Sequence, residues 1–384
     1  MKKIIFLIES KFNQRDYNRF GIKIIKNRGY SVEIWDFTSM FRKEYHKSYT
    51  PPDYVDLDFL FPITCKDEFL TKINNLDKGV IVLSILGNSE GNLFIYKTLQ
   101  KHSIHYGINL LGSQPKLELL SSLQLATNIH NPFKIIELVI KKFKRAIKGG
   151  KHVPGFILCG GKADIDDAKS WVDNTKIILV HALDYDLFLE EKKTTSNGIN
   201  RDYAVFIDQH LYYHPDIYGK NYRSGYMGSN ADWYYEKIKK FFLKVEKDLK
   251  LEIIIASHPR VNYKNNFKGR KVIKGKTNQL IKHSKLVLAH YSIAVNFAVL
   301  YKKPVMFVTS TNRNFHKHYR MWTGRFAKEL GNIPIDVNKN VSAIQIPIVN
   351  EEKYTLYKEN YIKMEGTPEK NTWEIFADYC EGLS

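Results

Sequence analysis

Residues 251–260 read Leu-Glu-Ile-Ile-Ile-Ala-Ser-His-Pro-Arg, and this stretch decides the fold. The apolar run over 251–256 is typical of a strand buried on both faces of a parallel sheet. The strand ends in His258, Pro259 and Arg260, and the proline restricts the turn so that the imidazole and the guanidinium point out of the strand end. Cationic and hydrogen-bonding side chains at such an end suit a phosphate. The stretch therefore predicts a buried strand with an anion-binding carboxyl end.

Around this strand the C-terminal half alternates strand and helix patterns. Strand-like runs lie at 203–207, 251–256, 286–289 and 304–308, and helical patterns lie at 231–249, 278–283 and 292–301. Strands that alternate with helices predict a mostly parallel, doubly wound sheet.

The N-terminal half repeats this alternation. Strand-like runs lie at 4–8, 30–37, 79–86, 107–111, 155–159 and 176–180, and helical patterns lie at 15–26, 92–100 and 131–148. The polar, turn-rich segment 190–201 is typical of a linker between domains. We therefore predict an α/β protein with two Rossmann-like domains, 1–195 and 200–350, and a cleft between them. A helical segment over 351–384 is expected to pack back on the domains.

Composition limits the cellular setting and the partners. The chain has 384 residues, three cysteines without metal-ligand spacing, and a formal net charge of +19. No run approaches the roughly 20 apolar residues of a membrane-spanning helix, so we expect a cytoplasmic protein. The cysteine spacing and the lack of a convincing Asp-x-Asp motif at a strand end predict no metal, and we expect no other cofactor. The positive charge favours polyanions, and the basic amphipathic pattern at 131–148 predicts peripheral contact with the anionic inner face of the cell membrane. An ordinary solvated helix face explains that pattern equally well.

A second strand end carries a similar group of polar residues. The run 285–289 ends in His290, Tyr291 and Ser292, and a helical pattern follows at once. A serine hydroxyl and free backbone N–H groups at a helix start are suited to an anion. Because the carboxyl ends of strands in one open sheet share a crevice, this group is expected to join His258 in a single site.

These motifs resemble those of bacterial glycosyltransferases with the two-domain B-type fold (GT-B), which make capsules, lipopolysaccharide and related surface polysaccharides. Sialyltransferases and Kdo transferases of that group carry a His-Pro motif and a downstream serine motif that hold the phosphate and cytidine of a CMP-sugar. Here these look like His258-Pro259 and Ser292. The serine motif is incomplete, because Tyr291 precedes Ser292 in place of the first serine of a pair. The resemblance implies a donor-binding C-terminal domain and an acceptor-binding N-terminal domain.

Three carboxylates are candidates for the catalytic base. Asp208 follows the strand-like run 203–207, and Asp208-Gln209 also looks like a motif of Kdo transferases. Glu9 and Glu90 follow strand-like runs of the N-terminal half. A carboxylate at such a position can take the proton of an acceptor hydroxyl, or it can simply hold a turn or a helix start.

Lys276 and Thr277 belong to a Gly-Lys-Thr sequence without the earlier glycines of a phosphate-binding P-loop. The sequence indicates no strand in front of it, which argues against an ATPase. Both residues are nevertheless candidates for contact with the donor.

The sequence thus predicts a metal-independent, inverting glycosyltransferase with a nucleotide-sugar donor and a glycan or lipid-linked acceptor. The resemblance favours a CMP-linked Kdo or another nonulosonic acid. A UDP- or GDP-sugar transferase or a polyol-phosphate transferase on the same fold remains an alternative. So does a non-catalytic basic protein that binds nucleic acid or a membrane surface, although no nucleic-acid-binding motif is present.

Overall fold

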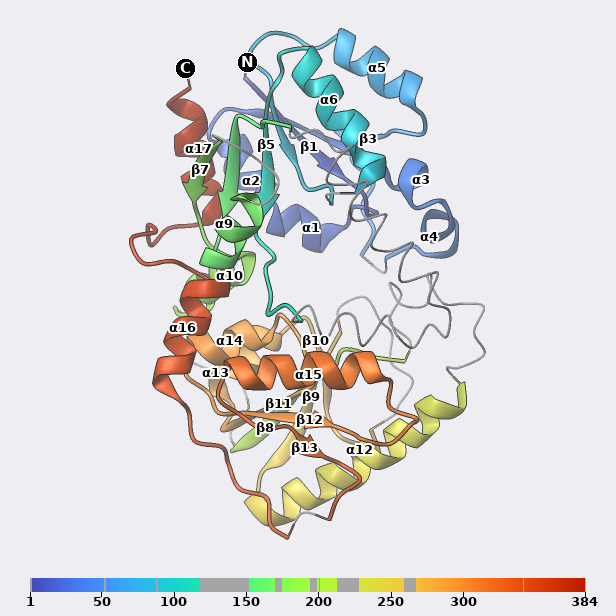
Figure 1. Cartoon of the computed structure of the whole chain (residues 1–384), viewed down its shortest axis with the longest axis vertical. Helices are drawn as coiled ribbons and strands as arrows, with labels where there is room; N and C mark the ends of the chain where they lie inside the picture. The colour runs from blue at the N-terminus through green and yellow to red at the C-terminus, as the bar shows by residue number, and fades with distance from the viewer. Residues whose placement is uncertain are drawn as a thin grey trace. The chain divides into compact units, whose positions relative to one another are not determined.

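The structure, a computed structural model, describes residues 2–51, 53–87, 89–117, 152–169, 175–193, 199, 201–212, 228–258, 267–340 and 342–383. The described residues form two compact units (Figure 1). The first holds the described residues within Met1–Ser113, Ile129–Asp186 and Lys363–Ser384, and the second those within Gln114–Asn128 and Leu187–Ile362. The predicted basic helix at 131–148 lies outside the described residues.

The first unit is built on a seven-stranded parallel sheet in the order β3-β2-β1-β4-β5-β6-β7. Its strands are β1 (Lys3–Ile8), β2 (Ser31–Asp36), β3 (Leu60–Pro62), β4 (Ile81–Ser84), β5 (His105–Leu110), β6 (Phe156–Cys159) and β7 (Lys176–Leu179). Its helices are α1 (Gln14–Arg19), α2 (Ile22–Asn27), α3 (Thr38–Phe41), α4 (Lys43–Ser48), α5 (Lys66–Asn74), α6 (Leu93–Lys101), α9 (Lys162–Lys169) and α17 (Thr372–Glu381), with a 3-10 turn η1 (Glu90–Asn92). The β1 sequence KIIFLI is apolar after its lysine and almost fully buried, as a central strand requires.

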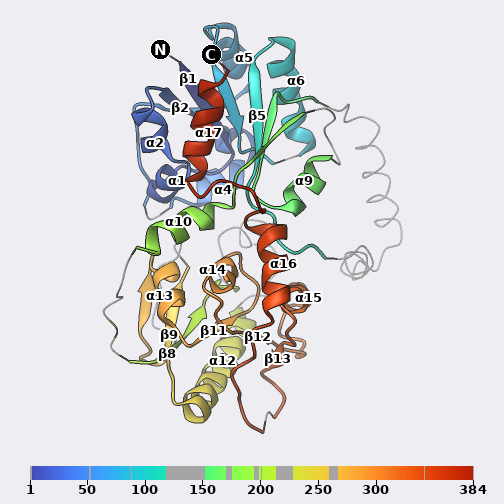
Figure 2. The same ribbon diagram turned by 90° about the vertical axis from the view of Figure 1, so that its left-hand side faces the viewer.

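The C-terminal helix α17 completes the core of the first unit. It lies beside α2 (Figure 2), and Trp373 packs edge-on against Phe6 of the central strand. Gly21 lies directly under the indole, since a Cβ atom on Gly21 would stand 2.2 Å from Trp373 Cγ.

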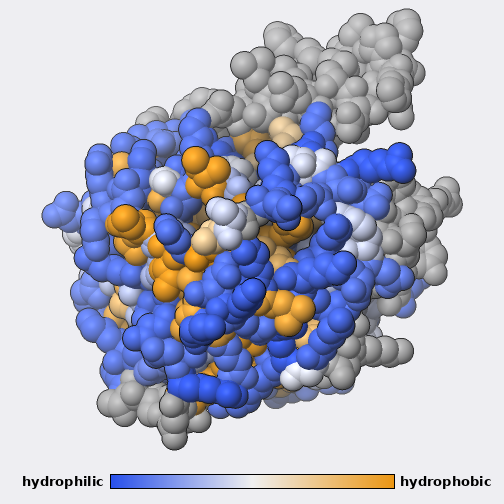
Figure 3. Space-filling model, turned by 90° about the horizontal axis from the view of Figure 1, so that it is seen from below, coloured by the Kyte–Doolittle hydropathy of each residue, from blue (hydrophilic) through white to orange (hydrophobic). Residues whose placement is uncertain are grey.

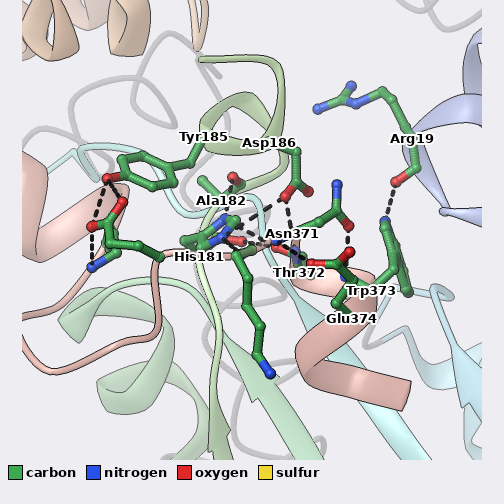
Figure 4. A network of polar contacts seen from close by, with 12 residues as sticks. Arg19, His181, Ala182, Tyr185, Asp186, Asn371, Thr372, Trp373 and Glu374 are labelled. Atoms are coloured by element: carbon green, nitrogen blue, oxygen red, sulfur yellow. Dashed lines mark hydrogen bonds and ion pairs between the residues drawn. The ribbon is translucent and has the colours of Figure 1, made fainter. Parts of the chain in front are cut away.

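Polar contacts fix the start of α17 (Figure 4). The Thr372 amide donates to Asp186 Oδ1 at 2.8 Å, and the Thr372 hydroxyl lies 3.0 Å from Nδ1 of the fully buried His181. Trp373 Nε1 donates to the Arg19 carbonyl at 2.6 Å. These bonds tie the start of α17 to the last residue of α1, to His181, and to the first turn of α10 (Leu183–Glu191), the helix in which the chain passes from Asp186 of the first unit to Leu187 of the second.

The second unit has a six-stranded parallel sheet in the order β10-β9-β8-β11-β12-β13. Its strands are β8 (Tyr203–Ile207), β9 (Glu252–Ser257), β10 (Val272–Lys274), β11 (Leu286–Ala289), β12 (Val305–Thr309) and β13 (Ile335–Asp336). Its helices are α12 (Gly228–Leu249), α13 (Thr277–His283), α14 (Val295–Leu300), α15 (Lys317–Glu329) and α16 (Glu351–Tyr361). The apolar stripe of α12 packs on the sheet through Ile238, Phe242 and Val245.

Several predicted elements differ from the observed ones. The single helix expected over 15–26 is two helices, because Gly21 adopts φ +56° between them. The helix expected to begin at Ser292 begins at Val295. Helix α15 and the short edge strands β10 and β13 were not predicted. No helix of the described residues is long and apolar enough to span a bilayer.

Candidate functional site

The strand order of the second unit identifies one place for a ligand. From β8 the chain adds β9 and β10 on one side, and then β11, β12 and β13 on the other. The turns after β8 and β11 therefore diverge, and ligands of open α/β sheets bind at this switch point, outside the carboxyl ends of the strands. The turn after β8 carries Asp208, and the turn after β11 carries Tyr291 and Ser292.

Gln209 joins these two turns. Its Oε1 accepts a hydrogen bond from the Tyr291 backbone N–H at 3.0 Å, across 82 positions of sequence. In the sequence, Gln209 stands out only as part of the Asp208-Gln209 motif, which predicts no separate role for it. The bond holds the two sides of the switch point at a set distance, so a ligand there would meet an ordered edge.

Asp208 is placed at the edge but is only 2% exposed. Its amide continues the sheet by donating to the Ala256 carbonyl at 3.1 Å, and its Oδ1 accepts from the His210 amide at 3.0 Å. This second bond supports a turn in which His210 adopts the left-handed φ of +52°. In this arrangement the carboxylate orders the turn that presents Gln209.

His290 serves the interior of the unit. It is 1% exposed, its Nδ1 bonds to the Val308 carbonyl, and its Nε2 lies 2.8 Å from the Tyr234 hydroxyl. A carbonyl only accepts, so Nδ1 carries the proton and Nε2 accepts from the tyrosine. Burial lowers the pKa of His290 to about 4, which leaves the ring neutral at pH 7. With both ring nitrogens occupied and no charge, the predicted role of this side chain as a phosphate ligand is not supported, and we assign it a structural role.

Ser292 caps a turn and not the predicted helix start. Its hydroxyl accepts from the Ala294 amide at 3.2 Å, and its carbonyl accepts from the Val295 amide at 3.0 Å. The helix that follows, α14, has only six residues. The Tyr291 ring stacks on Tyr319 and Trp322, and burial raises its pKa. Ser292 thus lies at the switch point, but without the helix terminus that the sequence led us to expect.

The remaining predicted donor contacts lie along the same carboxyl edge. His258 follows β9 directly and is half-buried, whereas Pro259 and Arg260 lie outside the described residues. Lys276 is exposed and Thr277 is half-buried, and they begin α13 directly after β10. The expectation that no strand precedes them was wrong. The three-residue strand β10 is short and half exposed, so it has little apolar signal.

In the first unit, Glu9 occupies the corresponding switch point between β1 and β4. Its Oε1 accepts from the Gly87 amide, and its Oε2 accepts from Asn92 Nδ2, both at 3.2 Å. Asn92 is fully buried and also donates to the Gly87 carbonyl at 2.7 Å. Glu90 begins the 3-10 turn η1 in the same loop. Glu9 and Glu90 are therefore both at the carboxyl edge of this sheet, and Asn92 is a fixing residue that the sequence did not reveal.

The glycine pair after β6 does not form an anion site. The amides of Gly160 and Gly161 both donate to Asp164 Oδ2, at 2.8 and 3.0 Å. Burial is the main reason why the pKa of Asp164 is raised to about 6. This carboxylate therefore fills the position at which a phosphate would bind.

A polar loop after β12 was also not predicted from the sequence. The Thr311 amide and hydroxyl both donate to Asp336 Oδ2, and Asn338 donates to the Ser310 hydroxyl. The sequence signal was the hydroxyl-rich run 309–311 directly after a strand-like run. Among the described residues, no cluster of three or more His, Cys, Asp or Glu side chains could hold a metal ion.

Two doubly wound parallel units of this kind define the two-domain GT-B class, and the predicted fold class is confirmed. No protein-family model and no curated protein sequence matches the chain.

Among solved structures, the chain is similar to UDP-GlcNAc 2-epimerase from Methanocaldococcus jannaschii, with 15% identity, full coverage of both chains and a TM-score of 0.50. It also matches a UDP co-structure of S. aureus MnaA, with 10% identity, 100% of this chain and 97% of that chain covered, and a TM-score of 0.49. A third match is Arabidopsis thaliana UGT89C1 complexed with UDP, with 9% identity, 99% of each chain covered and a TM-score of 0.49. At these identities the likeness concerns the fold.

Proposed function

We propose that the chain is a glycosyltransferase that moves a sugar from a nucleotide donor to a hydroxyl group of a glycan or glycolipid acceptor in surface polysaccharide synthesis. The main support is the ordered switch point of the second unit, where the Gln209–Tyr291 bond joins the two turns at which nucleotides bind in such sheets. The first unit is proposed to bind the acceptor, and the second the donor. We also propose that the protein is cytoplasmic and lies at the inner face of the cell membrane.

The donor phosphate is proposed to lie along the carboxyl ends of β10, β9, β8 and β11. His258, Pro259 and Arg260 would meet it from β9, Lys276 and Thr277 from β10, and Tyr291 and Ser292 from β11. As the bond from the anomeric carbon to the phosphate oxygen breaks, negative charge grows on that oxygen. Cations and hydrogen-bond donors already in place stabilise this charge more in the transition state than in the ground state, and no metal is required.

The acceptor hydroxyl must lose its proton as it attacks the anomeric carbon. Asp208, Glu9 and Glu90 are the proposed bases, and a direct attack would invert the anomeric configuration. Asp208 and Glu9 each hold backbone or side-chain donors in the structure, so the proton transfer would need these bonds to loosen.

Two donor classes are proposed. A CMP-linked Kdo or another nonulosonic acid is supported by the His-Pro and serine motifs. A UDP-sugar is supported by the similarity to a UDP-GlcNAc 2-epimerase. A binding assay with free nucleotides separates the two classes.

The first experiment is a thermal-shift titration of the full chain with CMP, CDP, UDP, GDP and ADP. A nucleotide that binds only the folded state raises its stability by about 2.7 kcal/mol at a hundredfold excess over Kd. We expect one nucleotide to stabilise the chain selectively, and Gln209→Ala and His258→Ala to weaken its binding about tenfold. Exposed residues of the same types provide the controls, Gln100→Ala and His102→Ala.

Selective stabilisation by CMP supports the first donor class, and selective stabilisation by UDP the second. No stabilisation by any nucleotide contradicts the proposed function and favours a non-catalytic binding protein. Unchanged affinity in Gln209→Ala and His258→Ala would show that the nucleotide binds elsewhere.

A second candidate activity is epimerisation at C2 of UDP-GlcNAc, suggested by the name of the similar archaeal protein. An epimerase inverts one carbon of the sugar and needs no acceptor. Proton NMR of the chain with UDP-GlcNAc alone distinguishes the two activities. A C2 epimer would favour this candidate, whereas transfer that requires an acceptor would exclude it.

A further inference from the structure

Three isoleucines of the second unit are exposed at one end of its sheet. Ile333 is 90% exposed, Ile348 is 91% exposed and Ile346 is 42% exposed. We call these residues the isoleucine face. Figure 3 is seen from below the view of Figure 1, and apolar side chains gather in the middle of this surface among hydrophilic ones. Exposed isoleucine side chains keep apolar surface in contact with water, and a partner that covers this surface would gain free energy of binding.

The segment 342–350 runs along the end of the sheet at which the strands begin, and contacts at both of its ends hold it there. At one end, the Ile344 amide donates to Asp248 Oδ2 at 2.9 Å, and Lys244 donates to the Ser342 carbonyl at 3.3 Å. Both partners belong to the last turns of α12, which leads into β9. Ile344 itself is buried and anchors the segment in the core.

At its other end, the segment reaches the turn between α15 and β13. A Cβ atom on Gly331 would stand 3.4 Å from Asn350 Nδ2, so the two turns touch. Ile333 follows this contact by two residues and Ile348 precedes it by two. Two residues span about 7 Å at most, so both isoleucines lie near the same corner of the unit.

Lysines flank the isoleucine face on both sides. Lys247 and Lys250 are exposed at the end of α12, beside the start of the segment. Lys353 is exposed and packs against Gly331 at the other end. Of the acids on these elements, Asp248 and Glu351 form ion pairs with Lys244 and Lys302, and Glu352 is exposed beside Lys353. The surroundings of the apolar side chains are therefore mainly positive.

We propose that the isoleucine face binds an anionic lipid surface. The isoleucine side chains enter the boundary between headgroups and acyl chains, and Lys247, Lys250 and Lys353 contact the headgroup phosphates. Apolar side chains together with nearby basic residues are the combination that holds a protein on an anionic bilayer. This inference deepens the proposed location at the inner face of the membrane by naming the surface that binds lipid, and it does not depend on the proposed sugar transfer.

A second copy of the chain fits this face less well. In a two-fold interface each patch meets itself, so the flanking lysines of both copies would face one another and repel. Three side chains also cover much less than the roughly 800 Å² per partner of a stable interface. An anionic bilayer avoids the repulsion between lysines, because it attracts them. It also binds a small apolar patch without a complementary shape.

The position of the face agrees with a role separate from the nucleotide site. It lies where the strands of the second unit begin, whereas Gln209 and Tyr291 lie where strands of the same sheet end. Attachment through the isoleucine face would therefore leave the carboxyl edge of that sheet free.

Co-sedimentation of the full chain with vesicles tests the proposal. One set of vesicles is phosphatidylcholine alone, and the other contains about one third phosphatidylglycerol. We expect binding to the anionic vesicles at low salt, with a loss of about 100-fold in Ile333→Ser/Ile348→Ser and about tenfold in Lys247→Glu/Lys250→Glu. Both isoleucines are exposed, so their replacement should leave the fold intact, which a thermal melt verifies.

Two matched variants serve as controls. Val153→Ser removes another exposed apolar side chain, and Lys97→Glu/Lys101→Glu makes the same change in net charge on the first unit. Both should bind vesicles like the parent. The sequence at 131–148 is the same in every variant, so any contribution from it cancels.

Equal binding of the parent and Ile333→Ser/Ile348→Ser would overturn the proposal, as would no binding to anionic vesicles. A dimer that the same double substitution abolishes in sedimentation velocity, without vesicle binding by the parent, would assign the face to a second copy.

Discussion

At the scale of single residues, buried titratable groups of this chain have structural roles. His290, directly after β11, bonds to groups of the core, and Asp164, in the first turn of α9, holds the glycine turn after β6. Burial shifts the pKa of both groups. The sequence could place His290 at a strand end. It could not show that Tyr234 and Val308, 56 and 18 positions away, would occupy both nitrogens. The sequence therefore predicts which strand ends carry polar residues, but it does not show which of their side chains can face a ligand.

Replacement of His290 by alanine should destabilise the chain by about 2–4 kcal/mol at pH 7, because it removes the hydrogen bonds of the ring to two buried polar groups and leaves a cavity in the core. In the parent, the folded-state pKa of His290 is about 4, below that of the unfolded chain. The unfolded state binds the proton first, so this contribution to stability is lost as pH falls from about 6.5 toward 4. Urea denaturation at pH 7 and 4.5 measures both effects, with His102→Ala as control. Equal losses in both variants would contradict the structural role.

Asp164→Asn should show the opposite dependence. The folded-state pKa of Asp164, about 6, lies above the unfolded value, so its contribution is present in acid and is lost as pH rises through 6. An asparagine oxygen can still accept the bonds from Gly160 and Gly161. We therefore expect the variant to equal the parent near pH 4 and to exceed it by about 2 kcal/mol at pH 7.5. Denaturation curves from pH 4 to 8 test this, and a constant difference would refute it.

At the scale of elements, buried segments were predicted from the sequence more accurately than exposed ones. The strands β8 and β11 were predicted with their observed bounds, because Tyr203–Ile207 and Leu286–Ala289 are unbroken apolar runs in the centre of the sheet. The edge strands β10 and β13 have three and two residues and little apolar signal. Helix α15 was missed because Thr323 interrupts its buried stripe and basic residues fill its first turns.

The fit of α17 on the first unit gives a prediction at this scale. Gly21 and Gly29 both have positive φ, but only Gly21 faces another residue, with Trp373 in the place of a Cβ atom. Gly29→Ala should cost about 1 kcal/mol for its backbone conformation alone. Gly21→Ala should cost about 3 kcal/mol or more, since the indole must also move. Thermal and chemical denaturation of the two variants compares them, and equal losses would mean that the Trp373 contact is unimportant.

At the scale of the whole molecule, two parallel α/β sheets were predicted from the alternation of strand and helix patterns. In its later part the chain passes from the first unit to the second within α10, and it returns to the first between Ile362 and Lys363. The polar segment 190–201, predicted to be the linker, follows the first of these passages by a few residues. A helix continues through that passage, so its sequence shows no break in pattern that could mark it. The assignment of acceptor and donor to separate units stays a prediction.

The second passage has a consequence for how the chain is made. Trp373 and Phe376 are buried in the first unit, yet the ribosome adds them after every strand of both sheets. While the nascent chain grows, the surface around Phe6 and Gly21 stays without its cover, and the second unit emerges in the meantime. The first unit, whose strands are made before those of the second, therefore gains its last core helix only after the second unit has been made. Until then its uncovered apolar surface is prone to aggregation.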